Sequence, residues 1–321
     1  MNNGIRARVL KHLTTIVLML ASSGAAAALP LDLLGLDTQA KLELGKSGST
    51  AGKEVVIAVI DDGFATDLPA LKGMQWRNST EIAYNGIDDD NNGYVDDRTG
   101  WDVADMDSDI APPATRRAEF EHGSYTASLI AEVIRAKLGE QDDYPIKLML
   151  IKAVPDQSID LDLRLGYQGI KYAIQNGANV VSNAWSGGQL QKDDAGILNS
   201  ALAKGVTIIN SVGNYPTEQA SMPAAHPAVF GVAGVDASGR IIKLSNYGSE
   251  VDLVSVAQAI SSVSLSSESG QRVESGTSVA VPVIAATAAL MKLVNPDISR
   301  NEIQDCLVNT AKPVDRQNPL I

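Results

Sequence analysis

Three polar side chains that lie far apart in the chain could together form a nucleophilic site. Asp61 follows an apolar run, His122 opens a stretch with a helical pattern, and Ser278 begins a second, very apolar stretch. A serine hydroxyl is a poor nucleophile at neutral pH, so it needs a base such as histidine, which a carboxylate can orient in turn. Taken singly, such residues more often have structural roles, the carboxylate in a turn and the hydroxyl as a helix cap. Their order and surroundings therefore decide between the two interpretations.

The base is the member of this set that the sequence identifies most sharply, because the chain has only three histidines, His12, His122 and His226. His12 lies in a segment that we expect to be cleaved off. His226 lies in a turn of small residues before a predicted strand, where a surface or packing role is typical. Gly123 and Ser124 leave room for another part of the chain to approach His122. We expect His122 to be the base, with activity rising as its imidazole loses a proton at roughly pH 6 to 7.

Ser278 lies where a helix N-terminus would favour a developing anion. The small residues of segment 275–278 lead into an apolar stretch, and Pro282 is expected in the first helical turn, where its missing N–H costs little. Backbone N–H groups and the positive end of the helix dipole would then face the serine hydroxyl. The alternative is that Thr277 or Ser278 simply caps the helix.

A parallel sheet would bring these residues together. Short apolar runs alternate with helical patterns, which is typical of a doubly wound α/β fold with a mostly parallel central sheet and helices on both faces. Ligands bind at the carboxyl ends of such strands, where Asp61 and Asn214 are expected. The predicted strands are residues 54–60, 146–154, 178–185, 206–212, 228–235 and 251–256, and the predicted helices are residues 123–137, 161–176, 195–204, 277–294 and 300–307.

Several segments together resemble the subtilisin-like serine proteases, the subtilase family. The order Asp61, His122, Ser278 is the order of the subtilisin triad. Residues 59–63 (VIDDG) resemble the family's aspartate motif, residues 122–127 (HGSYTA) its histidine motif, and residues 276–282 (GTSVAVP) its serine motif, which is the most specific. The similarity extends roughly over residues 54–311.

The resemblance implies a serine endopeptidase whose substrate is a polypeptide. Ser278 would be the nucleophile, His122 its base and Asp61 the carboxylate that orients the imidazole. Residues 212–214 resemble the segment that carries the oxyanion asparagine, so Asn214 and the N–H of Ser278 would donate hydrogen bonds to the oxyanion. No cofactor is implied for the chemistry.

Departures from the family pattern leave a second interpretation open. Residues 182–187 (SNAWSG) differ at the edge that normally pairs with substrate, and residues 256–258 (VAQ) replace an Ala-Pro-Gly segment. Val283 and Ala286 stand where the family usually has His and Gly, and the loop 214–223 is short. The alternative is a non-catalytic or weakly active subtilase-fold peptide-binding protein. A lipase or esterase is less well supported, because the G-x-S-x-G elbow and the order Ser, Asp, His are both absent.

An acidic stretch between the aspartate and histidine motifs has the spacing of a calcium-binding loop. Residues 88–96 follow the pattern D-x-D-x-N-G-x-x-D, in which alternate positions offer oxygen ligands and a glycine allows the turn. The candidate ligands are Asp88, Asp90, Asn92 and Asp96. Thr99 occupies the position at which an EF-hand has its bidentate glutamate, so the alternative is a solvated acidic loop. We expect structural Ca²⁺ here, and its removal should lower the stability.

The overall composition excludes several classes of protein. The chain of 321 residues has 26 Lys and Arg against 38 Asp and Glu, and a net charge of −12 argues against a nucleic-acid partner. Its one cysteine, Cys306, allows neither an internal disulfide nor a multi-cysteine metal site. Hydrophobic residues make up 45% of the chain, which is typical of a globular protein with a full core.

The first segment resembles a secretory signal. Basic residues precede a short apolar run and the small residues 25–28, which is the arrangement of a signal peptide with an A-x-A cleavage site. We therefore expect a signal peptide over residues 1–28, a short N-terminal segment over 29–53 and a catalytic domain over 54–321. The protein would be secreted or periplasmic in a bacterium, with no stable membrane span after cleavage.

Overall fold

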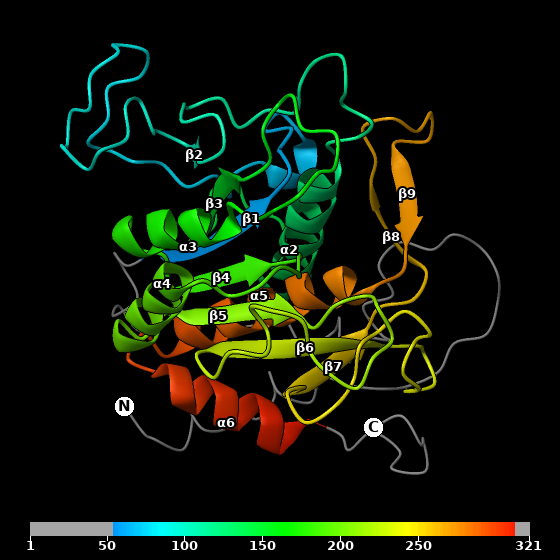
Figure 1. The fold of residues 1–321 in the computed structure, drawn as a ribbon. Helices are drawn as coiled ribbons and strands as arrows, with labels where there is room; N and C mark the ends of the chain where they lie inside the picture. Colours follow the sequence, from blue (N-terminus) through cyan, green and yellow to red (C-terminus); the bar gives the residue numbers. More distant parts are fainter. Residues whose placement is uncertain (1–53, 312–321) are drawn as a thin grey trace.

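A seven-stranded parallel sheet forms the centre of the protein in the computed structural model, which describes residues 54–311 (Figure 1). The predicted signal peptide and the segment 29–53 lie outside the described residues. The strand order is β2-β3-β1-β4-β5-β6-β7. The strands are β1 (Val55–Asp61), β2 (Gly100–Asp102), β3 (Ile146–Lys152), β4 (Val180–Asn183), β5 (Thr207–Ser211), β6 (Val229–Val235) and β7 (Leu253–Val256). From β1 the strands are added in one direction through β3 and β2 and in the other direction from β4 to β7. The strand order therefore reverses between β1 and β4, where sheets of this kind form a crevice for ligands.

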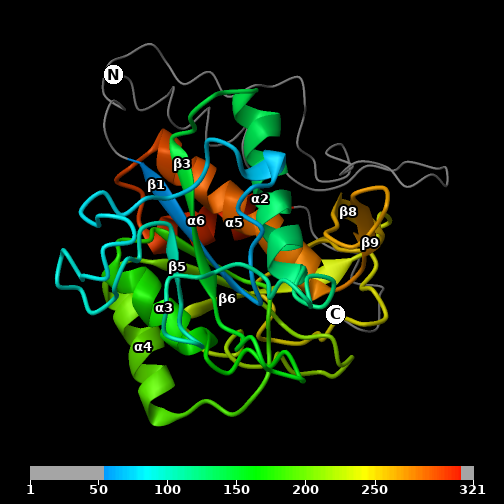
Figure 2. The same ribbon diagram turned by 90° about the horizontal axis from the view of Figure 1, so that it is seen from above.

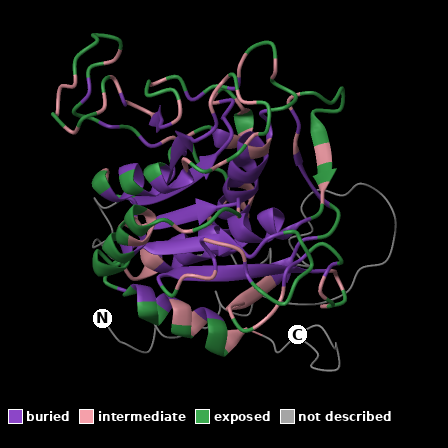
Figure 3. Cartoon of the chain, in the orientation of Figure 1, coloured by how far each residue is buried: buried purple, intermediate pink, exposed green. Residues whose placement is uncertain are grey.

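Helices cover both faces of this sheet (Figures 1 and 2). They are α2 (His122–Leu138), α3 (Gly166–Gln175), α4 (Lys192–Ala203), α5 (Thr277–Val294) and α6 (Arg300–Thr310), with a 3₁₀ turn η1 (Pro69–Leu71). Alternate residues of β1 point to opposite faces. Val55, Ile57 and Val59 share a buried cluster with α2 and α5, whereas the residues between them pack with α3 and α4. Both faces are therefore covered, which explains why the strands are apolar along their whole length and buried (Figure 3).

The doubly wound α/β fold that the sequence predicted is confirmed. Each predicted strand and helix corresponds to an observed element, although several ends differ, most clearly the start of α3 at Gly166. The sequence did not predict β2, nor the antiparallel hairpin formed by β8 (Ile260–Val263) and β9 (Gln271–Glu274). This hairpin stands apart from the sheet and leads directly into α5 (Figure 1).

Helix α5 lies in the interior of the molecule, on the same face of the sheet as α2. Among the described residues it is the one helix long and apolar enough to cross a membrane, yet nearly all of it is buried inside the molecule. The helix begins at Thr277, so Pro282 lies beyond the first turn and the prediction of a first-turn proline is wrong. Because proline has no N–H, the carbonyl of Ser278 lacks its usual helical partner.

Candidate active site

The end of β1 and the start of α2 place a carboxylate against an imidazole. Asp61 is the last residue of β1 and is fully buried, and His122 is the first residue of α2. Nδ1 of His122 lies 2.8 Å from Oδ1 and 3.0 Å from Oδ2 of Asp61. The backbone N–H of Asp62 and the hydroxyl of Thr126 also donate to this carboxylate, at 2.9 and 3.1 Å. Asp61 is therefore held in place from three sides, and Nε2 of His122 is the ring nitrogen left for other partners.

The neighbouring Asp62 accepts hydrogen bonds from backbone N–H groups of α2 rather than from the imidazole ring. Its carboxylate accepts hydrogen bonds from the backbone N–H groups of His122 and Gly123, at 3.2 and 2.7 Å, and so caps the start of α2. Burial, with the charge of Asp61 adding to it, raises the pKa of Asp62 to about 7. A Cβ atom on Gly123 would lie 2.5 Å from the carbonyl oxygen of Gly63, so only glycine lets α2 approach β1 this closely.

The carboxylate of Asp61 favours the charged form of the His122 imidazole. Burial disfavours the imidazolium, but the charge of Asp61 and its hydrogen bond outweigh that penalty and raise the pKa of His122 well above 6.5. The imidazole side chain is 28% exposed, whereas the Asp61 side chain is 1% exposed. The carboxylate is thus shielded from water, and the imidazole remains accessible from one side.

Ser278 and Asn214 meet at the N-terminus of α5. Asn214 follows β5, and its Oδ1 accepts hydrogen bonds from the backbone N–H and the hydroxyl of Thr277, at 2.9 and 3.0 Å. Gly276 is the N-cap residue, so neither Thr277 nor Ser278 caps the helix, in contrast to the alternative considered from the sequence. With Oδ1 engaged, the side-chain nitrogen of Asn214 remains as a donor. The N–H of Ser278 lies in the first turn, where N–H groups have no helical acceptor.

All four predicted catalytic residues line one cleft. Asp61, His122, Asn214 and Ser278 contribute to a cavity of about 1090 Å³, which we refer to as the cleft. The side chains come from β1, α2, the loop after β5 and α5, all at one edge of the sheet. His226 lies outside the cleft and accepts a hydrogen bond from the N–H of Ala228 at 3.1 Å, which agrees with a structural role.

Two aromatic side chains form a wall of the cleft: Trp185 lies in the segment that departs from the family pattern, and Tyr167 lies on α3. The ring centroids of Trp185 and Tyr167 lie 5.5 Å apart at 81°, an edge-to-face contact. A Cβ atom on Gly166 would lie 2.2 Å from Cζ2 of Trp185, so the indole occupies the space that glycine leaves. Within residues 54–311, neither Nε1 of Trp185 nor the hydroxyl of Tyr167 has a hydrogen-bond partner.

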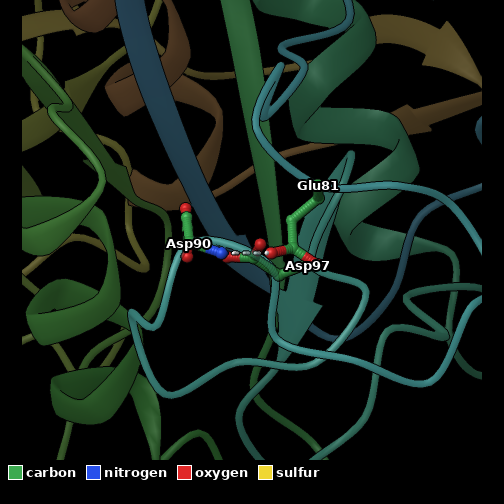
Figure 4. A group of neighbouring side chains, drawn as sticks. All are labelled: Glu81, Asp90 and Asp97. Carbon is green, nitrogen blue, oxygen red and sulfur yellow. Dashed lines mark hydrogen bonds between the residues drawn. The ribbon is translucent and has the colours of Figure 1, made fainter.

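The acidic loop between η1 and β2 brings together a group of carboxylates that only partly matches the predicted one (Figure 4). Ligand oxygens of Glu81, Asp90 and Asp97 lie within 4.8 Å of one another, and of the predicted ligands only Asp90 belongs to this group. Glu81 and Asp97 are buried. Three converging carboxylates fit the preference of Ca²⁺ for roughly six to eight oxygen ligands.

The remaining predicted ligands make contacts of their own. Asp88 and Asp96 accept hydrogen bonds from backbone N–H groups of the loop, at 2.8 to 3.0 Å. Asn92 directs its side-chain nitrogen, rather than its oxygen, to Asp90 and Asp97, at 3.3 and 3.1 Å. Glu81 accepts hydrogen bonds from backbone N–H groups of the loop as well, so it is the convergence of their oxygens that sets Glu81, Asp90 and Asp97 apart from Asp88 and Asp96.

A second group of carboxylates already has a cation of its own. Nζ of Lys152, which is buried at the end of β3, lies 2.5 Å from Asp102, 2.6 Å from Asp156 and 3.4 Å from Asp105. Burial opposes the charged ammonium, but its hydrogen bonds to Asp102 and Asp156 raise the pKa of Lys152 above its usual range. The ammonium of Lys152 offsets part of the negative charge of these carboxylates.

Comparisons with known proteins point to one family. The model of the subtilase family matches residues 52–320. Subtilisin-like protease 1 of Plasmodium berghei (strain Anka) is 25% identical over 305 residues, which cover 87% of this chain and 49% of that protein. Thermitase of Thermoactinomyces vulgaris is 29% identical over 215 residues, which cover 67% of this chain and 74% of thermitase. The chain thus spans about half the length of the Plasmodium relative.

The fold has close counterparts among solved structures. A crystal structure of a cold-adapted subtilisin-like serine proteinase matches with a TM-score of 0.63 at 19% identity, covering 95% of this chain and 93% of that one. The prenylagaramide maturation protease PagA matches with a TM-score of 0.59 at 18% identity, covering 84% and 87%. At these identities the likeness concerns the fold.

Proposed function

The chain belongs to the subtilase family, and from this premise we propose that it is an exported serine endopeptidase that hydrolyses peptide bonds in polypeptides. The observation that supports this most directly is the hydrogen-bonded pair of His122 and Asp61, which shares one cleft with Ser278 and Asn214. Activity depends on such a site rather than on the fold, because one fold can host many functions.

In the proposed reaction, Oγ of Ser278 attacks the carbonyl carbon of the scissile bond and Nε2 of His122 accepts the hydroxyl proton. The imidazolium then donates this proton to the leaving amine, and an acyl-enzyme forms. Asp61 stays ionised throughout. It holds Nδ1 of His122 in the protonated tautomer and stabilises the positive charge while it exists. In the second half of the reaction His122 deprotonates a water that attacks the acyl carbon, and the imidazolium then returns the proton to Oγ of Ser278 as the carboxylic product leaves.

The oxyanion of the tetrahedral intermediate would be bound by two donors. These are the side-chain nitrogen of Asn214 and the backbone N–H of Ser278. The hydrogen bonds from Thr277 to Oδ1 of Asn214 support this assignment, because they fix the orientation of the amide before substrate arrives. Removal of one such donor costs on the order of 10²–10³ in kcat, a magnitude taken from subtilisin itself.

Two further properties belong to the proposal. Export is supported by the signal-like composition of residues 1–28, and the protein would act outside the cytoplasm. Structural Ca²⁺ in the acidic loop is supported by the convergence of Glu81, Asp90 and Asp97. The ion would neutralise these carboxylates and order the loop, and it would take no part in the chemistry.

Hydrolysis of a fluorescently labelled casein tests the proposed function. The mature wild-type protein should release labelled peptides, and Ser278→Ala should reduce the rate to background. Asn214→Ala should retain a low, measurable rate, because the triad would remain. Binding of casein by the wild type without any cleavage would instead support the alternative of a non-catalytic peptide-binding protein.

A further inference from the structure

A buried carboxylate ties the β8–β9 hairpin to the residue next to His122. Glu121 immediately precedes His122, and its side chain is 6% exposed. Its Oε2 accepts hydrogen bonds from the N–H of Leu265 at 2.7 Å and the hydroxyl of Ser264 at 3.0 Å, and its Oε1 accepts one from the hydroxyl of Ser266 at 3.1 Å. All three donors lie in the turn between β8 and β9, so one carboxylate pins the whole turn to the start of α2.

Arg272 on β9 adds an ionic contact to the same carboxylate. Its Nη1 donates to Oε1 of Glu121 at 2.7 Å, and its Nη2 pairs with Glu274. The guanidinium also lies over the ring of Tyr125 on α2, 5.9 Å from the ring centroid. A planar guanidinium pairs with two carboxylates through separate nitrogens in a fixed plane, whereas a lysine ammonium is a point charge with no preferred plane. Arg272 therefore joins β9 to α2 at the margin of the cleft.

This contact joins the segments that precede the two reacting side chains. Glu121 lies directly before His122, and β9 ends at Glu274, four residues before Ser278. His122 and Ser278 belong to different helices, so their separation depends on how those helices and the hairpin are held. A misplacement of about 1 Å can cost roughly 10²-fold in rate.

We propose that Glu121 and Arg272 are positioning residues, whose ion pair holds the β8–β9 hairpin against the start of α2 and thereby sets His122 relative to Ser278. The inference rests on the proposed function, because it concerns the same nucleophile and base. Neither residue takes part in bond making.

The pair also predicts opposite electrostatic effects on His122. The charged groups that act on this imidazole are Asp61 and Asp62 at the end of β1 and Glu274 on β9, and Arg272 offsets Glu274. Loss of the Arg272 charge would leave Glu274 uncompensated, which favours the imidazolium. Loss of the Glu121 charge would leave the positive charge of Arg272 less compensated, which disfavours the imidazolium form of His122. Substitutions that only lowered the stability of the protein would not move the titration of His122 in opposite directions.

The test uses the rate constant for labelling of the mature protein by a fluorophosphonate probe, measured from pH 5 to 11. Glu121→Gln and Arg272→Gln should each lower the plateau rate by about tenfold, through misplacement of the base. The double variant should be about as slow as the slower single variant, because both changes sever the same pair. The acidic limb should move down in Glu121→Gln and up in Arg272→Gln.

Arg240→Gln is the matched control. It removes an arginine that pairs with Asp236 at 3.1 Å, but its side chain is 74% exposed and lies outside the cleft. It should leave both the plateau and the limb unchanged.

Unchanged plateau rates in the folded single variants, or losses that multiply in the double variant, would overturn the inference. If Glu121→Gln fails to fold, Arg272→Gln and Arg272→Lys decide the question. The lysine keeps the charge but lacks the planar fork that fixes the geometry of the pair, so its rate should lie between those of the wild type and Arg272→Gln. A wild type that is not labelled at all would contradict the proposed function and this inference with it, whereas a labelled wild type with unaffected variants would contradict this inference alone.

Discussion

The orientation of the Asp61 side chain depends both on the residue itself and on the contacts that its neighbours make. A carboxylate at the end of a strand is common, and turn chemistry usually explains it. Here Thr126, one helical turn after His122, donates to Asp61, and Asp62 turns away to cap α2. The result is a buried carboxylate aimed at one nitrogen of one imidazole.

The raised pKa of His122 predicts where activity begins on the pH scale. The base must be neutral, so kcat/KM should rise as pH passes through the pKa of His122. Burial opposes protonation, but Asp61 raises this pKa, so the acidic limb should lie well above pH 6.5 rather than between 6 and 7 as the sequence alone suggested. The labelling rate of the free enzyme measures the limb without a known substrate. A limb at or below pH 6.5 would contradict the electrostatic account of the site.

The sequence alone predicted the four candidate catalytic residues that share the cleft, because their types and order carry the information. It could not predict Thr126, Glu121 or Arg272 as their supports. A threonine on a helix, or an ion pair between residues 151 positions apart, leaves no local pattern. Such contacts arise only when the sheet brings distant segments together.

Among the secondary-structure elements, the start of α3 has a close contact with the cleft wall, because Gly166 leaves the space that the indole of Trp185 fills. Gly166→Ala should destabilise the protein by about 1–3 kcal/mol, the usual cost of overpacking a tight site. The added methyl group would overlap the indole, which lies 2.2 Å from the position of the new Cβ. Thermal unfolding should show a lower Tm, and the displaced indole should alter the cleft.

Gly196 on α4 is the control for this change. A Cβ atom there would meet nothing within 4 Å, so Gly196→Ala should stabilise the helix by about 0.5–1 kcal/mol. Equal effects of the two substitutions on Tm would show that the space around Gly166 is not limiting.

The elements themselves were predictable where they are long and buried. The strands β1 and β3 are each seven residues long and fully buried, and α5 is a helix of 18 mostly buried residues. Long runs of mainly apolar residues are easy to recognise in a sequence. β2 is only three residues long, and β9 alternates between exposed and half-buried residues. These elements exist because of pairing with neighbours, which periodicity does not reveal. The predicted helix 277–294 begins where α5 does, so Pro282 was misplaced within a correctly bounded helix: it lies beyond the first turn that Thr277 opens.

At the scale of the whole molecule, the acidic loop predicts that stability depends on calcium. An ion bound only by the folded state stabilises it by RT ln(1 + [L]/Kd), about 2.7 kcal/mol at a hundredfold excess over Kd. Excess EDTA should therefore lower the Tm of the wild type relative to millimolar Ca²⁺. Mg²⁺ should substitute poorly, because it demands a tighter octahedral geometry.

Variants of the loop distinguish the converging carboxylates from the rest of the acidic surface. Glu81→Gln combined with Asp90→Asn should abolish the response of Tm to Ca²⁺. Asp193→Asn, at an exposed position in the first turn of α4, should leave it intact. A wild-type melting curve that is identical in EDTA and in millimolar Ca²⁺ would leave the loop as a solvated insertion.

The proposed site depends on the whole fold, because the sheet and the helices bring Ser278, His122 and Asp61 to one cleft. The most direct measurement is labelling of the mature protein with a fluorophosphonate probe, followed by mass spectrometric mapping of the modified residue. We expect a single adduct on Ser278, no labelling of Ser278→Ala, nearly complete loss in His122→Ala and little loss in His226→Ala. Undiminished labelling of Ser278→Ala would contradict the proposed site.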